Sequence, residues 1–100
     1  MSRRRAQVHY TLVAEQALHD IAEYTLSEWG AAQCSRYMTL LQEYCEVLLP
    51  QHAPLARPVP GRPALRMLRC EQHVIYFRSV DDGFEVVHVL HARQLPARHL

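Results

Sequence analysis

The sequence has only three glycines and no long apolar run, and each shortage excludes a class of protein. Three scattered glycines cannot supply the glycine-rich loop with which many nucleotide-binding proteins hold phosphates. No apolar run reaches the roughly 18 residues that a membrane span needs. The arginines at positions 3–5 are not followed by an apolar stretch, so they do not mark a secretory signal. We therefore expect a cytoplasmic protein without a membrane partner.

Cysteine is also scarce, and its three positions do not form a metal-binding or redox motif. No two cysteines have CxxC spacing, and Cys34 and Cys45 fall 11 residues apart on one predicted helix. That separation corresponds to about 16 Å along a helix, which is too far for a disulfide bond. We expect buried free thiols, no metal site and no cofactor.

Lysine is absent, so all 11 basic residues are arginine, and the formal net charge is +1. Most acidic residues lie between Glu15 and Glu46, so the second half of the chain is the basic half. Arginine recognises carboxylates and phosphates in planar, bidentate geometry, which suits an acidic protein partner or a nucleic acid. A high-GC genome, which encodes arginine in place of lysine, explains the missing lysine but not this clustering.

The first half of the chain predicts a strand followed by two helices, within a single domain over residues 1–100. Period-two alternation predicts a strand over residues 7–12, and helical spacing predicts a helix over 14–29. Gly30 is placed as the cap that ends this helix. A second helix is predicted over 31–49, where Pro50 ends it. So short a connection predicts an antiparallel pair of helices.

The second half predicts three strands after a proline-rich connector. Residues 50–63 hold five of the six prolines and predict an extended connector that cannot be helical. Three β-rich runs follow over 64–70, 73–79 and 84–92, and the last two are joined by an Asp-Gly turn. The order β-α-α-β-β-β predicts an α+β fold, with the helical hairpin packed on one face of a small antiparallel sheet.

Alternation along the predicted strands spreads the reactive side chains over both faces of the sheet. In the run 84–92, His88 and Leu90 share one face with Val86, whereas Val89 and His91 lie on the other. No adjacent pair is forced into hydrogen-bonding reach, although metal-free RNA cleavage would need residue types that are present. These are Arg66, Arg69, His73, Tyr76, Arg78, His88, His91 and Arg93. The face away from the helices mixes apolar and arginine side chains, as protein–protein interfaces do.

Three segments resemble the ParE toxins, in order and over nearly the whole chain. Residues 28–33 (EWGAAQ), continuing to Arg36-Tyr37, are similar to the turn of the ParE helical hairpin. Residues 63–67 (PALRM), with Arg69-Cys70-Glu71 and His73, resemble the second ParE strand and its turn. Residues 86–93 (VVHVLHAR) resemble the last strand, which ends in a family-typical Leu-His-x-Arg. The match is nearest to the plasmid-stability branch.

The resemblance implies the RelE/ParE superfamily fold and a toxin that binds and inhibits DNA gyrase without being an enzyme. It implies a ParD-type antitoxin that wraps and neutralises the toxin, and no sequence-specific DNA binding by the toxin alone. The related RelE branch cleaves mRNA on the ribosome, often with a tyrosine near the C-terminus. This chain has no tyrosine after Arg93, which favours the non-nuclease branch. A RelE-like ribosome-dependent endoribonuclease is the alternative, and a silent module that binds only its antitoxin is the third hypothesis.

Two sets of residues are the candidate contacts. The candidate target contacts are Arg66, Arg69, Tyr76, Arg78, His91 and Arg93. The candidate antitoxin contacts are Trp29, Leu40, Tyr44, Val47 and Arg66. Leu40, Tyr44 and Val47 form a second apolar row on the second helix, which is either covered within the fold or exposed as a groove for a partner helix. Arg66 and Arg93 have a structural alternative, in which they tie the sheet to the connector and tail.

Overall fold

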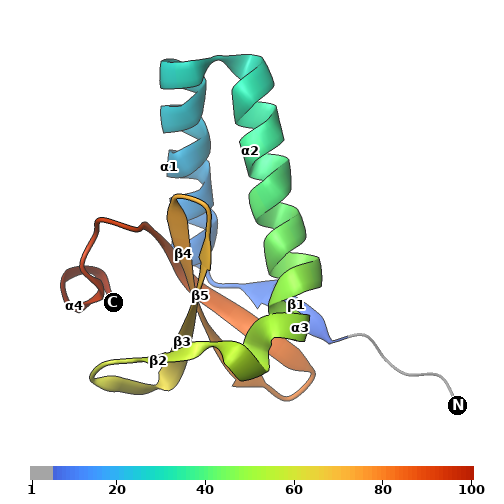
Figure 1. Ribbon diagram of the computed structural model, residues 1–100, viewed down its shortest axis with the longest axis vertical. Helices are drawn as coiled ribbons and strands as arrows, with labels where there is room; N and C mark the ends of the chain where they lie inside the picture. Colours follow the sequence, from blue (N-terminus) through green and yellow to red (C-terminus); the bar gives the residue numbers. More distant parts are fainter. Residues whose placement is uncertain (1–5) are drawn as a thin grey trace, which may run out of the picture.

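In the computed structural model, which describes residues 6–100, two long helices stand on one face of a five-stranded sheet (Figure 1). The elements are β1 (Gln7–Tyr10), α1 (Leu12–Trp29), α2 (Ala31–Glu43), a π-helical turn η1 (Tyr44–Leu48), α3 (Leu49–His52), a 3₁₀ turn η2 (Ala53–Leu55), β2 (Arg57–Val59), β3 (Arg62–Cys70), β4 (His73–Val80), β5 (Gly83–His91) and α4 (Pro96–His99). The predicted α+β fold and its element order are confirmed, and β2 and α4 are additions. Within residues 6–100, no helix is both long and apolar enough to cross a membrane.

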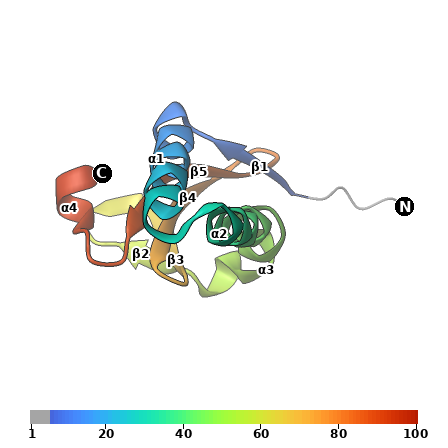
Figure 2. The same ribbon diagram turned by 90° about the horizontal axis from the view of Figure 1, so that it is seen from above.

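Thr11 begins helix α1 and also ties it to the sheet. Its hydroxyl oxygen accepts a hydrogen bond from the Ala14 amide at 3.0 Å, which satisfies one of the unpaired N–H groups of the first turn. The same hydroxyl donates to the Val87 carbonyl at 2.9 Å. Seen from above, α1 lies over the sheet and packs on β5 and α2 (Figure 2). Gly30, with a φ of 86°, reverses the chain at the predicted position.

The prediction that the second helix ends at Pro50 was wrong. α2 continues through η1 into α3, where Pro50 lies in the first turn and its missing N–H is tolerated. The turn η2 follows, so the first part of the connector over 50–63 is helical and not extended. The π-helical turn changes the helical phase, after which Leu49 and Ala53 face the core.

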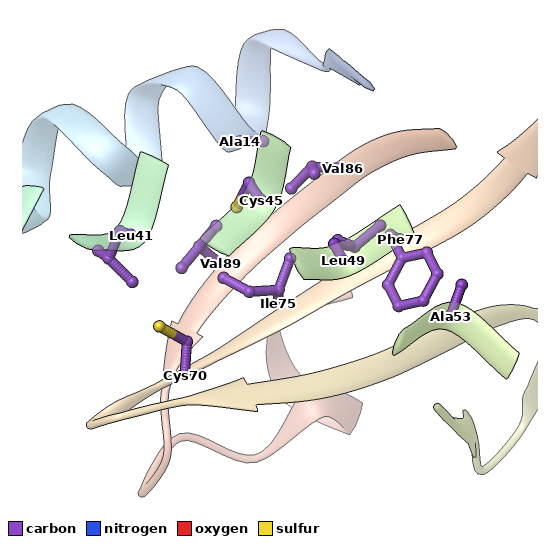
Figure 3. Close-up of a cluster of buried hydrophobic side chains, with 10 residues drawn as sticks. All are labelled: Ala14, Leu41, Cys45, Leu49, Ala53, Cys70, Ile75, Phe77, Val86 and Val89. Atoms are coloured by element: carbon purple, nitrogen blue, oxygen red, sulfur yellow. The ribbon is translucent and has the colours of Figure 1, made fainter. Parts of the chain in front are cut away.

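The sheet has the strand order β1-β5-β4-β3-β2. β3, β4 and β5 form the predicted antiparallel meander, β2 pairs with β3, and β1 pairs with β5 in parallel. Gly83 permits the last pairing, because a Cβ there would lie 2.1 Å from the Gln7 carbonyl oxygen. The main core fills the space between the helices and the sheet (Figure 3). Its buried residues are Ala14, Leu41, Cys45, Leu49, Ala53, Cys70, Ile75, Phe77, Val86 and Val89.

The three cysteines are free, as predicted. Cys45 and Cys70 are buried in the core, whereas Cys34 is half-buried and its thiol donates to the Ala22 carbonyl across the hairpin at 3.3 Å. Burial raises the pKa of the Cys45 thiol to about 12 and that of Cys70 to about 11. These thiols therefore act as apolar packing groups at neutral pH.

A β-bulge in β5 changes the face on which the last residues of the strand lie. Phe77 pairs with Val86, whereas its neighbour Tyr76 pairs with His88, so Val87 is an extra residue. Val86 and Val89 consequently both face the helices and are buried in the main core. The predicted alternation over 84–92, which placed Val89 opposite Val86, was wrong after Val87.

The outer face of the sheet carries a second, smaller core. Val59, Tyr76 and Leu90 are buried there, and the C-terminal Leu100 packs against them. The other side chains of this cluster are Leu65, Met67, Val74 and Val87. The Arg62 guanidinium donates to the Leu100 carbonyl, so the tail is attached to β3. Both faces of the sheet are therefore partly covered by the chain's own segments.

Replacing Thr11 with alanine removes both hydrogen bonds of the helix start. We expect the free energy of unfolding to fall by about 1–2 kcal/mol, because an N-cap and a bond to the sheet are lost together. Urea denaturation measures this change. Thr39→Ala on the exposed side of α2 is the matched control, which should change stability by less than about 0.5 kcal/mol. Equal stabilities of the two variants would contradict the role of Thr11.

Candidate functional site

A cleft of about 660 Å³ lies between the helical hairpin and the adjoining ends of β4 and β5. Tyr24 and Trp29 of α1 form an exposed aromatic rim. Tyr37 of α2 and His73 of β4 lie on the wall, with His91 at the end of β5. Arg93 and Asp20 also line the cleft and contribute one charge of each sign. The cleft therefore joins an apolar wall to a few polar groups, as binding sites for ligands and side chains do.

Tyr37, His73 and His91 form a connected group inside the cleft. The Tyr37 hydroxyl lies 2.6 Å from His73 Nδ1, and it also accepts a hydrogen bond from the Gln72 amide at 3.3 Å. The Tyr37 hydroxyl and His73 Nδ1 thus share one short hydrogen bond, in which the His73 tautomer decides which group donates. The rings of His73 and His91 meet edge to face, with centroids 5.4 Å apart. Within residues 6–100, no group of three or more potential ligands is placed to hold a metal ion.

His73 is neutral at physiological pH. Burial, reinforced by the neighbouring His91, lowers the pKa of its imidazole from 6.5 to about 4. Burial also raises the pKa of the Tyr37 hydroxyl above its usual value of 10.0. Both groups thus remain uncharged, and the pair acts as a fixed hydrogen bond between the hairpin and the sheet.

The reactive side chains are spread over both faces of the sheet, as the alternation predicts, but two of them, His73 and His91, come together on the helix-facing side. The bulge at Val87 moves His91 to the helix-facing side of β5, where it pairs with His73. Tyr37 lies on the second helix, 36 positions before His73, and nothing in the sequence pairs the two. The period-two pattern alone gives no sign of a bulge, which explains why this group was missed.

The candidate target contacts separate into three places. Arg69 and Arg78 lie on the outer face of the sheet, and the Arg78 side chain makes an ion pair with Glu85 at 2.8 Å. His91 and Arg93 lie in the cleft. Arg66 lies near η2, where its guanidinium donates to the Ala53 carbonyl at 3.4 Å, in line with the predicted tie to the connector. Tyr76 is only 2% exposed, so it supports the outer face from beneath and is not available to a partner in the free chain.

The candidate antitoxin contacts also divide between two regions. Leu40 and Val47 are exposed, whereas Tyr44 is half-buried and its ring packs edge to face against His52 at 6.3 Å. Leu40 and Val47 are therefore open to solvent, whereas Tyr44 packs partly against the main core. Trp29 ends α1 at the hairpin turn, whereas Val47 lies in η1, beyond the far end of α2. Helix α2 runs from that turn towards α3 (Figure 1). An antitoxin that contacted both residues would have to follow the length of the hairpin.

The lowered pKa of His73 makes stability depend on pH. The unfolded chain binds a proton at His73 near its ordinary value of 6.5, whereas the folded chain does so near 4. Between these values the unfolded state holds more protons, so the folded state loses stability as the pH falls through the window.

His73→Asn tests this linkage, because the asparagine amide can donate to or accept from Tyr37 but does not titrate. We expect the original chain to lose about 1 kcal/mol more stability than His73→Asn between about pH 7 and pH 5, after allowance for partial exposure. Urea denaturation at both pH values measures the difference. Equal losses would show that His73 is not held neutral by its surroundings.

Comparisons with known proteins agree with this fold. Residues 8–96 match the family model described as ParE toxin of type II toxin–antitoxin system, parDE. The Escherichia coli protein named Toxin ParE is 38% identical over 84 residues, which are 83% of this chain and 82% of that protein.

Two solved structures share the architecture. A chain of the chromosomal ParDE system from P. aeruginosa superposes with a TM-score of 0.73 at 18% identity, covering 87% of this chain and 96% of its own. A chain of the RelBE2 toxin–antitoxin complex from Mycobacterium tuberculosis gives a TM-score of 0.67 at 15% identity, with coverage of 88% and 99%. At these identities, the two structures support the fold, and the sequence matches identify the family. The chain belongs to the ParE toxin family of type II toxin–antitoxin systems.

Proposed function

We propose that this ParE-family chain inhibits DNA gyrase in the cytoplasm by binding it, and that a ParD-type antitoxin neutralises it. The family match and the relative named Toxin ParE support the first part. The solved ParDE system, which carries a similar fold, supports the second. The proposed action by protein–protein binding rests on one observation, that arginines border an apolar cluster on the outer face of the sheet.

The outer face suits a protein partner more than a small substrate. Arg57 pairs with Met67, and Arg69 pairs with Val74, so both guanidiniums border the apolar cluster on that face. Arg78 is already paired with Glu85 at its edge. Apolar side chains with arginines around them are typical of interface cores, where arginine adds bidentate bonds to carboxylates. A partner with acidic and apolar side chains would match this pattern.

The cleft favours a second candidate function, a RelE-like ribonuclease, because it brings Tyr37, His73, His91 and Arg93 together. Its chemistry argues against that function. General acid–base catalysis works best with a pKa near the operating pH, and His73, with a pKa of about 4, is a weak base. The Nδ1 nitrogen of His73 is already hydrogen-bonded to Tyr37. Arg93 is the sole arginine on the described cleft wall, whereas a cleaved phosphate needs stronger charge stabilisation.

The purified chain should inhibit DNA supercoiling by gyrase at near-stoichiometric concentration. Arg69→Glu should raise the concentration needed for half-inhibition by about tenfold or more, because an exposed cation at the proposed interface becomes an anion. Arg36→Glu, a charge reversal on the exposed side of α2, is the matched control and should inhibit like the original chain. No inhibition at stoichiometric excess would refute gyrase as the target. Cleavage of mRNA in a translation extract would instead establish the ribonuclease function.

Val47→Asp should weaken binding of the antitoxin without unfolding the toxin. Val47 is 47% exposed, so the folded chain tolerates a charge there, whereas an apolar partner groove does not. We expect about a tenfold or greater rise in the dissociation constant. Leu26→Asp on α1 is a matched control, because Leu26 has a similar exposure of 51%. Isothermal titration calorimetry measures both, and equal affinities would exclude the row of Leu40, Tyr44 and Val47 as the docking surface. Leu40→Asp provides an independent repeat.

A further inference from the structure

We propose that residues 87–91 of β5 are a strand-addition site, at which an extended segment of the antitoxin pairs with the edge of the sheet. The inference rests on the proposed neutralisation by an antitoxin and assigns a binding site for it. The site is separate from the row of Leu40, Tyr44 and Val47 on the second helix. It is defined by backbone groups and not by side chains alone.

The edge of β5 has no strand neighbour beyond its first residues. β1 pairs with β5 from Gly83 to Val86, and at Thr11 the chain turns into α1. In the described part of the chain, no strand continues along this edge from Val87 to His91. Half of β5 therefore presents one side of its backbone to a neighbouring groove.

Side chains satisfy three polar groups of this edge, whereas the His91 carbonyl accepts from the Gln94 backbone amide at 2.9 Å. The Val87 carbonyl accepts from the Thr11 hydroxyl at 2.9 Å. The Val89 amide donates to the ring nitrogen Nδ1 of His88 at 2.9 Å, and the His91 amide donates to the side-chain oxygen of Gln94 at 2.8 Å. These groups recur every second residue, which is the spacing at which an edge strand offers bonds to an added strand. The two amides can exchange their side-chain acceptors for the carbonyls of a partner.

A groove of about 570 Å³ runs beside this edge and leaves room for the segment. Its helical wall extends along α1 from Leu12 to Ile21, a rise of about 13.5 Å. About four extended residues span that length at roughly 3.3 Å each. Gln94 and His99 of the tail form the opposite wall. The dimensions therefore fit one short strand.

The groove offers apolar contacts together with the backbone groups. Leu12 is 83% exposed and Val13 is also exposed, although both belong to the first turn of a core helix. His88 and His99 line the same groove. A helix satisfies its own backbone and would leave the two amides unused, whereas an extended peptide bonds to them and turns alternate side chains towards the apolar wall. The expected occupant is an extended segment in which apolar and polar residues alternate. Its apolar side chains would face Leu12, and its hydrogen-bond acceptors would face His88.

The side chains of Thr11, His88 and Gln94 cap the polar groups of this edge. Such caps can also serve only to protect an edge strand from unwanted pairing. That role predicts that the caps stay in place when the antitoxin binds. Strand addition predicts that they are replaced. The two therefore differ in the behaviour of the Val89 and His91 amides in the complex.

Amide hydrogen exchange of the full chain, measured by NMR with and without its antitoxin, separates these outcomes. The probe is the full-length small protein whose gene adjoins that of the toxin. In the complex we expect exchange at Val89 and His91 to slow by about tenfold or more, with inter-chain contacts to their α-protons. Unchanged exchange at both amides in a formed complex would overturn the inference. Failure to form any complex would instead refute the proposed antitoxin.

A pair of variants gives an independent measurement. Leu12→Asp places a charge on the groove wall, and Leu55→Asp is its matched control, because Leu55 is 81% exposed but lies in η2, outside the groove. Leu12→Asp should weaken antitoxin binding by about tenfold or more, and Leu55→Asp should not. Amide spectra establish that both variants fold. If Leu12→Asp binds like the original chain, no segment occupies this groove. If it weakens binding but the two amides remain unprotected, the occupant is not a strand, and the inference fails.

Discussion

The extra residue at Val87 in β5 determines on which face of the sheet the last side chains of the strand lie. Because of this bulge, Val86 and Val89 both enter the main core, and the strand remains anchored on either side of the irregularity. The same shift turns His91 into the cleft and puts His88 on the outer face beside Tyr76. A strand with regular alternation would bury His88 in the core and turn Val89 to the outer face. Apolar and polar residues do not alternate regularly along β5. The bulge nevertheless lets its apolar side chains enter the core while its histidines stay outside it.

Much of the fold could be predicted from local patterns, because each depends on neighbouring residues. Gly30 marks the hairpin turn, and Asp82-Gly83 marks the turn between β4 and β5, since both positions have backbone requirements that few residues meet. The predictions failed where the local structure depends on contacts between residues far apart in the sequence. Pro50 did not end its helix, because the preceding π-helical turn places it in a first turn, where its missing N–H is tolerated. The Tyr37–His73 bond joins residues 36 positions apart, and no periodicity reports such a pairing.

That hydrogen bond also determines the character of the cleft. A tyrosine and two histidines near an arginine are the residue types of a ribonuclease, and the same atoms could in principle act on a phosphate. Here the Nδ1 nitrogen of His73 is hydrogen-bonded to Tyr37, and burial keeps the ring neutral, so the pair contributes to shape and rigidity. Tyr24 and Trp29 remain exposed at the rim. A rigid wall beside exposed aromatic side chains is better suited to gripping an apolar side chain than to moving protons.

The cleft and the groove beside β5 are neighbouring surfaces, because both are lined by Asp20, Ile21, His73 and His91. Helix α1 therefore lines both hollows, and the two meet where β5 ends. A partner segment that paired along the edge from Val87 would reach His91 after four residues and arrive at the mouth of the cleft. A chain of 100 residues has little interior and cannot cover every apolar surface of its elements. In this molecule the cleft and the groove adjoin, so a single extended partner could occupy both in one continuous path. Binding in the groove would then raise the effective concentration of the segment that binds in the cleft, and the converse.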